Sequence, residues 1–153
     1  MRIHIEKDEQ TFFYAVARQI ADQIIQKPNS LIGLSTGRTT GPIHKALADI
    51  YEQERFDTSK VIFFGLDEVT NVSRDYFGSC YYMLLHEVIK PLNVPLEHYI
   101  MPPTTSENWP EACKSFESAL ENIGQVDLQI LGIGGNGHIG FNEPAEDFPK
   151  ITH

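Results

Sequence analysis

Apolar and polar positions along the chain repeat with two periods, one typical of helices and one typical of buried strands. Four segments have apolar side chains at helical spacing or a signal for the start of a helix. They are residues 9–27, 42–55, 80–89 and 107–123. Pro42 lies where the first turn of a helix tolerates proline, and Pro91 follows the third of these segments as a stop signal. The pattern therefore predicts four helices.

Short apolar runs lie between these segments. Residues 30–34 and 60–66 are almost continuously apolar, as is typical of central strands in a parallel sheet. Weaker strand signals cover residues 2–5, 98–101 and 126–131. Because strands and helices alternate, we predict an α/β fold with a doubly wound, mostly parallel sheet and helices on both faces. No linker divides the chain, so residues 1–153 form a single predicted domain.

Charge and composition narrow the possible partners. The chain has 12 basic and 21 acidic residues, a net charge of −9, which argues against nucleic-acid binding. No apolar run approaches the roughly 18 residues of a membrane span, and the N-terminus has no secretory signal. We therefore expect a cytoplasmic protein without membrane contact. Cys80 and Cys113 have no paired spacing and are expected to be buried free thiols.

Ligands of doubly wound sheets bind outside the carboxyl ends of the strands, and three unusual loops follow predicted strands here. The first loop contains Ser35, Thr36, Gly37, Arg38 and Thr39. Its backbone N–H groups, hydroxyls and arginine, together with the following helix N-terminus, suit a phosphate group. A nucleotide P-loop would end in Gly-Lys-Ser or Gly-Lys-Thr, which this loop lacks. A plain capped turn is the alternative interpretation.

The second loop begins with adjacent acids, Asp67 and Glu68. Neighbouring side chains on a strand point to opposite faces, so one carboxylate can face a ligand while the other makes structural hydrogen bonds. A carboxylate at the mouth of an apolar pocket can have a raised pKa and act as a proton-transfer base. A purely structural acid is the alternative.

The third loop, residues 132–144, is rich in glycine and contains a formal Gly-x-Gly-x-x-Gly match. Gly140 and Pro144 interrupt any long helix, so we do not expect dinucleotide binding. His138 is the candidate for chemistry, and Glu143 could hold its second ring nitrogen. No third ligand lies at metal spacing, so no metal is expected. A structural histidine is the alternative.

Residues 135–144, Gly-Asn-Gly-His-Ile-Gly-Phe-Asn-Glu-Pro, resemble the signature of glucosamine-6-phosphate deaminases, also called isomerases. Residues 66–68 and 34–39 resemble two further motifs of that family, in the same order, and the resemblance covers the whole chain. It implies a Rossmann-like enzyme that converts glucosamine 6-phosphate or galactosamine 6-phosphate to a ketose 6-phosphate and ammonia. The enzyme would be an aldose–ketose isomerase and deaminase of amino sugar metabolism, without a cofactor. Homo-oligomers are common among relatives.

The resemblance also implies roles for individual residues. His138 would open the sugar ring, with Glu143 orienting it, and Asp67 would move a proton from C2 to C1. Asn136 stands where many relatives have Asp, completing the catalytic set. Ser35, Thr36, Gly37, Arg38 and Thr39 would hold the 6-phosphate. Relatives continue well beyond the length of this chain, so the resemblance implies that a C-terminal portion is missing.

Two other functions remain open. A 6-phosphogluconolactonase shares the expected fold but usually has Asp-Glu-Arg in the second loop and lacks the Phe-Asn-Glu-Pro ending. Val69 and residues 141–144 therefore favour the deaminase. A sugar-phosphate-sensing domain without catalysis would need the first loop, but not His138 and Glu143 together.

Overall fold

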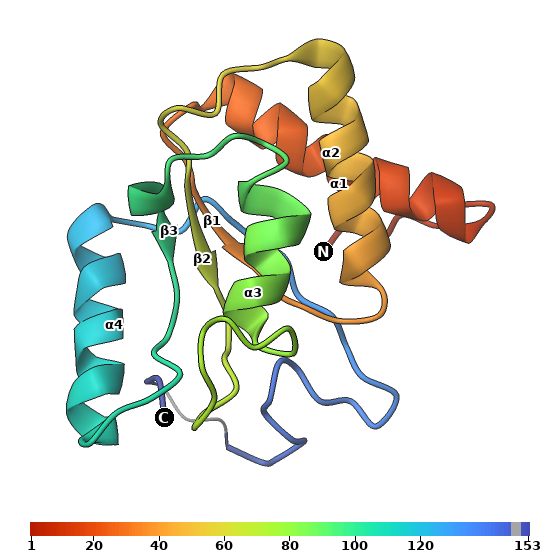
Figure 1. Ribbon diagram of the computed structural model, residues 1–153. Helices are drawn as coiled ribbons and strands as arrows, with labels where there is room; N and C mark the ends of the chain where they lie inside the picture. Colours follow the sequence, from red (N-terminus) through yellow and green to blue (C-terminus); the bar gives the residue numbers. More distant parts are fainter. Residues whose placement is uncertain (148–150) are drawn as a thin grey trace.

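The computed structural model describes residues 1–147 and 151–153 and contains a four-stranded parallel sheet between helices (Figure 1). The strands are β1 (Leu31–Leu34), β2 (Ile62–Gly65), β3 (Tyr99–Ile100) and β4 (Leu128–Gln129). The helices are α1 (Glu9–Gln26), α2 (Thr40–Glu54), α3 (Cys80–Leu84), a π-helical turn (Leu85–Ile89) continuing α3, a 3-10 turn (Leu96–His98) and α4 (Trp109–Ile123). Strand order is β3-β2-β1-β4, with every neighbouring pair parallel. The predicted fold class is confirmed.

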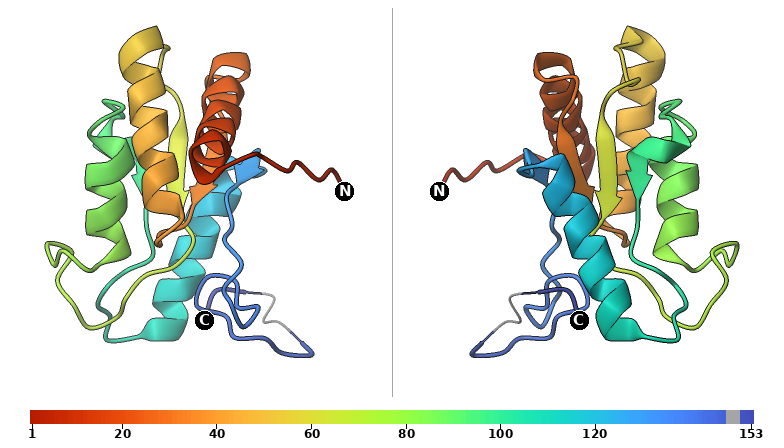
Figure 2. Two further views of the ribbon diagram at one scale, coloured as in Figure 1. Left: turned by 90° about the vertical axis from the view of Figure 1, so that its right-hand side faces the viewer. Right: turned by 90° about the vertical axis from the view of Figure 1, so that its left-hand side faces the viewer.

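The two faces of the sheet have separate cores, because successive side chains on a strand point in opposite directions. Ile32 and Phe63 lie in the larger core, which α1, α2 and α3 complete. Leu31 and Phe64 point the other way and pack against Phe116 of α4. Figures 1 and 2 show α4 on the side of the sheet opposite the other helices. Helices on both faces leave the strand ends free to carry loops.

Side chains cap three of the four α-helices. Asp8 accepts from the Thr11 N–H at the start of α1, Ser79 caps α3, and Asn108 caps α4. These bonds satisfy backbone donors that have no partner inside a helix. Thr39 precedes α2, and its side chain makes no capping hydrogen bond. The N-terminus of α2, next to the first loop, is therefore left without a side-chain cap.

The predicted first strand, residues 2–5, is wrong. This segment contains no strand, and Ile3 and Ile5 are 73% and 91% exposed. A strand is stable only when its backbone pairs with a neighbour, and the segment instead projects from the body (Figure 2). The segments predicted at 98–101 and 126–131 do contain strands, but only two residues of each form the paired elements. No helix in the described part of the chain is long and apolar enough to cross a bilayer.

Candidate active site

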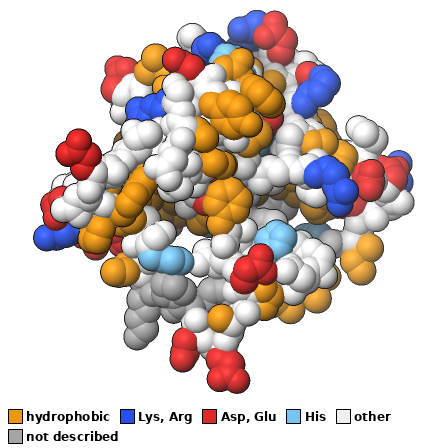
Figure 3. All heavy atoms as spheres, turned by 60° about the horizontal axis from the view of Figure 1, so that its bottom comes forward, with side chains coloured by type: hydrophobic (Ala, Val, Ile, Leu, Met, Phe, Trp, Pro, Cys, Tyr) orange, Lys and Arg blue, Asp and Glu red, His pale blue; other side chains and the backbone are white. Residues whose placement is uncertain are grey.

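The three loops predicted to carry chemistry follow β1, β2 and β4 and lie at the same edge of the sheet, at the bottom of Figure 1. The parallel arrangement brings them together, because all strands end at one edge. Figure 3 shows this side of the molecule, with histidines among hydrophobic side chains and most Lys and Arg toward the margin. Contacts described below connect Asp67 directly to the third loop, and through Cys80 of α3 to the first loop.

Asp67 is partly buried at the end of β2. The Cys80 thiol donates toward its Oδ1 atom at 3.7 Å. On its other side lies Gly140 of the third loop, so close that an added Cβ would be 3.0 Å from Oδ2. Burial raises the pKa of Asp67 above its ordinary value, the negative charge of Glu68 raises it further, and the Cys80 hydrogen bond opposes the rise. The side chain thus has the raised pKa expected of a proton-transfer base.

Glu68 has the second role predicted for this acidic pair. Its carboxylate accepts from the backbone N–H of Cys80 at 2.7 Å and of Tyr81 at 2.8 Å, and also from the Val69 N–H at 2.8 Å. Cys80 and Tyr81 are the first residues of α3, whose N–H groups need acceptors. Glu68 therefore fixes α3 against the end of β2, while Asp67 faces the neighbouring loops.

The third loop is a compact turn with no helix in residues 132–144. The Gly134 N–H donates to the His138 carbonyl at 2.8 Å, which folds the loop back on itself. Gly137 and Gly140 have φ values of 91° and 59°, a conformation that side chains with a Cβ rarely adopt. Gly140 also approaches Asp67. Its lack of a side chain therefore permits both the positive φ and this close approach. This geometry agrees with the expectation that the glycines do not open a dinucleotide-binding helix.

A chain of hydrogen bonds orders the polar side chains of this loop. Asn136 Nδ2 donates to Glu143 Oε2 at 2.7 Å, and Asn136 Oδ1 lies 2.7 Å from His138 Nδ1. The expectation that Glu143 holds His138 directly is wrong, because the Asn136 amide lies between them. An ionised carboxylate only accepts, so the amide must present its NH₂ to Glu143 and its oxygen to His138. In the neutral tautomer that fits this arrangement, Nδ1 of His138 donates to the Asn136 oxygen and Nε2 carries no proton.

The first loop supplies polar groups that the described residues leave partly unused. The Ser35 hydroxyl is buried and has no hydrogen-bond partner within the described chain. Thr36 Oγ1 lies 3.3 Å from the Cys80 sulfur. Arg38 and Thr39 are exposed, and Arg38 forms none of the ion pairs found among the described residues. Gly37 has a φ of 147° and begins the turn into α2.

The position of Cys80 between two of these loops could not be predicted from the sequence. Both cysteines are free, as expected, but only Cys80 is buried and Cys113 is partly exposed. Cys80 contacts Thr36, 44 residues earlier, and Asp67, 13 residues earlier, so no local spacing reveals the cluster. Burial raises the pKa of the Cys80 thiol to about 12, and the thiol therefore stays protonated at neutral pH.

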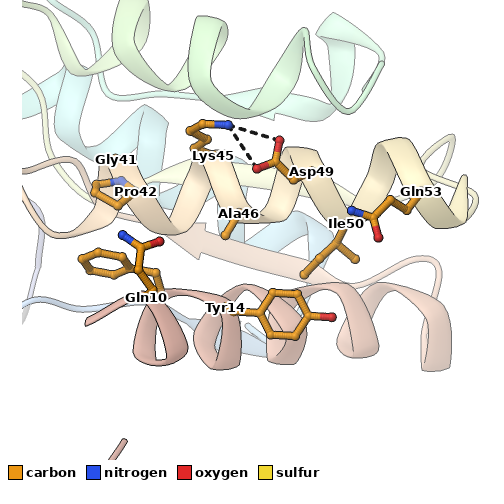
Figure 4. A pocket seen from close by; sticks show the side chains of 10 residues that line it. Gln10, Tyr14, Gly41, Pro42, Lys45, Ala46, Asp49, Ile50 and Gln53 are labelled. Atoms are coloured by element: carbon orange, nitrogen blue, oxygen red, sulfur yellow. Dashed lines mark hydrogen bonds and ion pairs between the residues drawn. The ribbon is translucent and has the colours of Figure 1, made fainter. Parts of the chain in front are cut away.

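One hollow of the molecule lies away from the predicted site residues. A groove between α1 and α2 is lined by residues including Gln10, Tyr14 and Pro42, and its Lys45 is paired with Asp49 at 3.1 Å (Figure 4). None of the predicted site residues lines it. Within residues 1–147 and 151–153, no three His, Cys, Asp or Glu side chains are placed to hold a metal ion.

Comparison with known sequences relates the chain to one family over most of its length. A family profile described as glucosamine-6-phosphate isomerases/6-phosphogluconolactonase matches residues 7–141. A glucosamine-6-phosphate deaminase of Clostridium botulinum (strain Loch Maree / Type A3) is 39% identical over all 153 residues. Another, from Thermoanaerobacter sp. (strain X514), is 38% identical over the same length. The chain spans 63% and 60% of the lengths of these two relatives.

Solved structures share the architecture. A monomeric glucosamine-6-phosphate deaminase superposes with a TM-score of 0.92 at 27% identity, over 96% of this chain and 61% of that one. A 6-phosphogluconolactonase from Plasmodium vivax gives a TM-score of 0.73 at 31% identity, over 88% of this chain and 49% of that one. The lactonase of Thermotoga maritima, 22% identical with a TM-score of 0.73 over 90% of this chain and 61% of that one, shares the fold.

Proposed function

Because the chain belongs to the family of glucosamine-6-phosphate isomerases and 6-phosphogluconolactonases, we propose that it carries catalytic residues of an amino-sugar-phosphate deaminase. The proposed reaction converts glucosamine 6-phosphate or galactosamine 6-phosphate to the ketose 6-phosphate and ammonia. The observation that carries the proposal is the contact between Asp67, whose pKa is raised by burial, and Gly140. Gly140 is two residues from His138, which supports the proposal that the two proton-transfer groups share one site.

Ring opening is assigned to His138. Nε2 of the neutral imidazole would take the proton from O1 of the pyranose, and the resulting imidazolium would return a proton to O5 as the C1–O5 bond breaks. The Asn136 oxygen supports this role because it holds the proton on Nδ1. Glu143 fixes the Asn136 amide and places a negative charge near the transient imidazolium.

Proton transfer between carbon atoms is assigned to Asp67. Its carboxylate would remove the proton from C2 of the open-chain aldehyde, giving an enolamine, and would return a proton to C1. The C2 imine formed in this way is hydrolysed by water to the ketone, with release of ammonia. A carboxylate of raised pKa suits both steps, because its ionised form is a stronger base than an ordinary aspartate.

The first loop is assigned to the 6-phosphate. The buried Ser35 hydroxyl lacks a partner among the described residues, and α2 begins without a side-chain cap. An anion at this point would accept from free backbone N–H groups and be favoured by the helix dipole. Thr36, Gly37 and Thr39 would add donors, and Arg38 would add charge.

The deaminase assignment is favoured over the lactonase. Curated relatives named glucosamine-6-phosphate deaminase are 38% to 39% identical over the whole chain. Lactonase structures superpose less closely than the deaminase structure, with TM-scores of 0.73 against 0.92. The Asn136–Glu143 hydrogen bond also gives the Phe-Asn-Glu-Pro ending a function in orienting the ring-opening histidine.

The test is ammonia release from glucosamine 6-phosphate and from galactosamine 6-phosphate, measured on this chain and on the longest natural form of the protein. Saturable release from one epimer is expected and would identify the substrate. Hydrolysis of 6-phosphogluconolactone without ammonia release would assign the lactonase. Sugar-phosphate binding by the longest form without turnover would instead favour a sensing domain.

Two finer expectations belong with this proposal. A phosphorylated sugar is an intracellular metabolite, so we expect the protein in the cytoplasm, where both free cysteines would remain reduced. We also expect a homo-oligomer, although the structural relative noted above is described as monomeric. Sedimentation of the longest natural form decides between these states.

A further inference from the structure

We propose that Cys80 is a positioning residue whose thiol donates a hydrogen bond to Asp67 and links this base to Thr36 of the first loop. The positioning role rests on the function proposed above, in which Asp67 is the proton-transfer base. The hydrogen bond itself is independent of that function and can be tested without substrate.

The position of Cys80 is fixed from its own backbone. It is the first residue of α3, follows the capping residue Ser79, and its N–H donates to the Glu68 carboxylate at 2.7 Å. Its side chain is 1% exposed, so no water competes for the sulfur. The backbone of Cys80 is therefore anchored by one acid of the pair, while its sulfur faces the other.

The direction of each hydrogen bond follows from proton counts. The sulfur lies 3.7 Å from Asp67 Oδ1 and 3.3 Å from Thr36 Oγ1. An ionised Asp67 can only accept, and the thiol has one proton, so the thiol donates to Asp67. The Thr36 hydroxyl must then donate to the sulfur. A single chain of donors thus runs from the first loop to the base.

This bond limits how far burial raises the pKa of Asp67. Among the described residues, the titratable groups that shift the pKa of Asp67 are Cys80, from α3, and Glu68, from its own loop. The first loop contributes the uncharged Thr36 through the sulfur, and the third loop contributes the uncharged Gly140. Burial and the charge of Glu68 raise the pKa of Asp67, while the thiol bond lowers it. Removing the thiol should therefore raise this pKa further.

Infrared spectroscopy tests the bond directly, because the S–H stretch falls where protein and water absorb little. The Cys113→Ala variant leaves Cys80 as the remaining thiol of this chain. We expect its S–H band to move as Asp67 titrates, and to lose that movement when Asp67→Asn is added. A Cys80 band that stays constant with pH and is unaffected by Asp67→Asn would overturn the proposal.

The functional consequence is tested by the pH dependence of kcat/KM in the longest natural form. Cys80→Ala should move the acid limb of this profile to higher pH by about half a pH unit to one pH unit. At pH values below the limb, kcat/KM should then fall roughly threefold to tenfold. Cys80→Ser should show a smaller shift than Cys80→Ala. The serine hydroxyl can still donate to Asp67, although its C–O bond is shorter than the C–S bond of cysteine. Cys113→Ala is the matched control and should leave the profile unchanged.

The outcomes separate the two proposals. An unmoved acid limb in an active Cys80→Ala enzyme would contradict the positioning role, since loss of the thiol hydrogen bond should raise the pKa of Asp67. If no variant releases ammonia, the proposed function fails while the infrared result still decides the hydrogen bond. If Cys80→Ala does not fold, the infrared experiment remains decisive because it retains Cys80.

Discussion

At Asp67, the burial that suits a proton-transfer base also works against the folded state. Its pKa is raised mainly by burial, so the folded protein binds a proton at pH values where the unfolded chain has lost it. The contribution of Asp67 to the free energy of unfolding is then fully present below the ordinary aspartate pKa of about 4, and is lost as pH rises through the raised pKa. Above that raised pKa, the charged and partly buried carboxylate costs stability.

We predict that Asp67→Asn lowers kcat by about a hundredfold or more while leaving the melting temperature at pH 7 equal or higher. The amide cannot take the C2 proton, yet it removes the buried charge. Ammonia-release kinetics and a thermal melt measure the two effects, and the exposed Asp75→Asn serves as the control. Full turnover in Asp67→Asn would remove this residue from the mechanism.

The imidazole of His138 depends on the glycine beneath it. A methyl group at Gly134 would overlap the ring atoms of His138, whereas one at Gly132 would meet nothing within 4 Å. We predict that Gly134→Ala lowers turnover by about a hundredfold through displacement of the ring, approaching the effect of His138→Gln. Gly132→Ala is the matched control and should retain activity. Equal activity of both alanine variants would show that the ring position is not critical.

On the scale of elements, the alternation of side chains at the end of β2 gives the adjacent acids Asp67 and Glu68 different contacts. Asp67 faces the third loop, and Glu68 accepts from the first N–H groups of α3. The sequence predicted this division, because alternation is a local property of strands. It could not predict that α3, through Cys80, reaches both Asp67 and Thr36, because that contact depends on how distant segments pack.

The Glu68 cap provides a prediction about stability. Glu68→Ala removes the acceptor of three backbone N–H groups and should lower the free energy of unfolding by about 2–3 kcal/mol. Glu68→Gln keeps one acceptor oxygen and should lose less. Urea denaturation followed by circular dichroism measures both, and equal stability of Glu68→Ala and the natural protein would contradict the capping role.

The predictions that failed are those that depend on which distant or intervening group a segment contacts. The segments 30–34 and 60–66 contain β1 and β2, as predicted, because a short and nearly continuous apolar run is typical of a strand covered on both faces. Residues 2–5 have the composition of a strand but pair with nothing in the described structure. Similarly, the direct link expected between Glu143 and His138 failed because spacing alone could not show the Asn136 amide between them.

Across the whole molecule, one side of the sheet is much better covered than the other. The larger core includes residues from α1, α2 and α3, while the smaller one depends on Phe116 and a few partly buried neighbours. β4 is an edge strand among the described residues. Apolar side chains near it remain exposed, including Leu131 at 49% and Ile133 at 78%. Such an edge can pair with another copy of the chain.

We therefore predict that the 153-residue chain self-associates with increasing concentration, which sedimentation velocity would measure. Ile133→Lys should reduce association, because a charge beside the open edge disfavours strand pairing. Ile3→Lys changes an equally exposed apolar residue away from the sheet and is the control. A chain that remains monomeric throughout would contradict the prediction.

The uncapped start of α2 has a consequence for the lifetime of the protein in the cell. A sugar phosphate bound there would supply the acceptors that Thr39 does not, so occupancy would favour the folded state by mass action. Supply of amino sugar would then protect the protein from proteolysis, and its depletion would expose the empty form to degradation. The abundance of the enzyme would follow the availability of its substrate without any dedicated regulator.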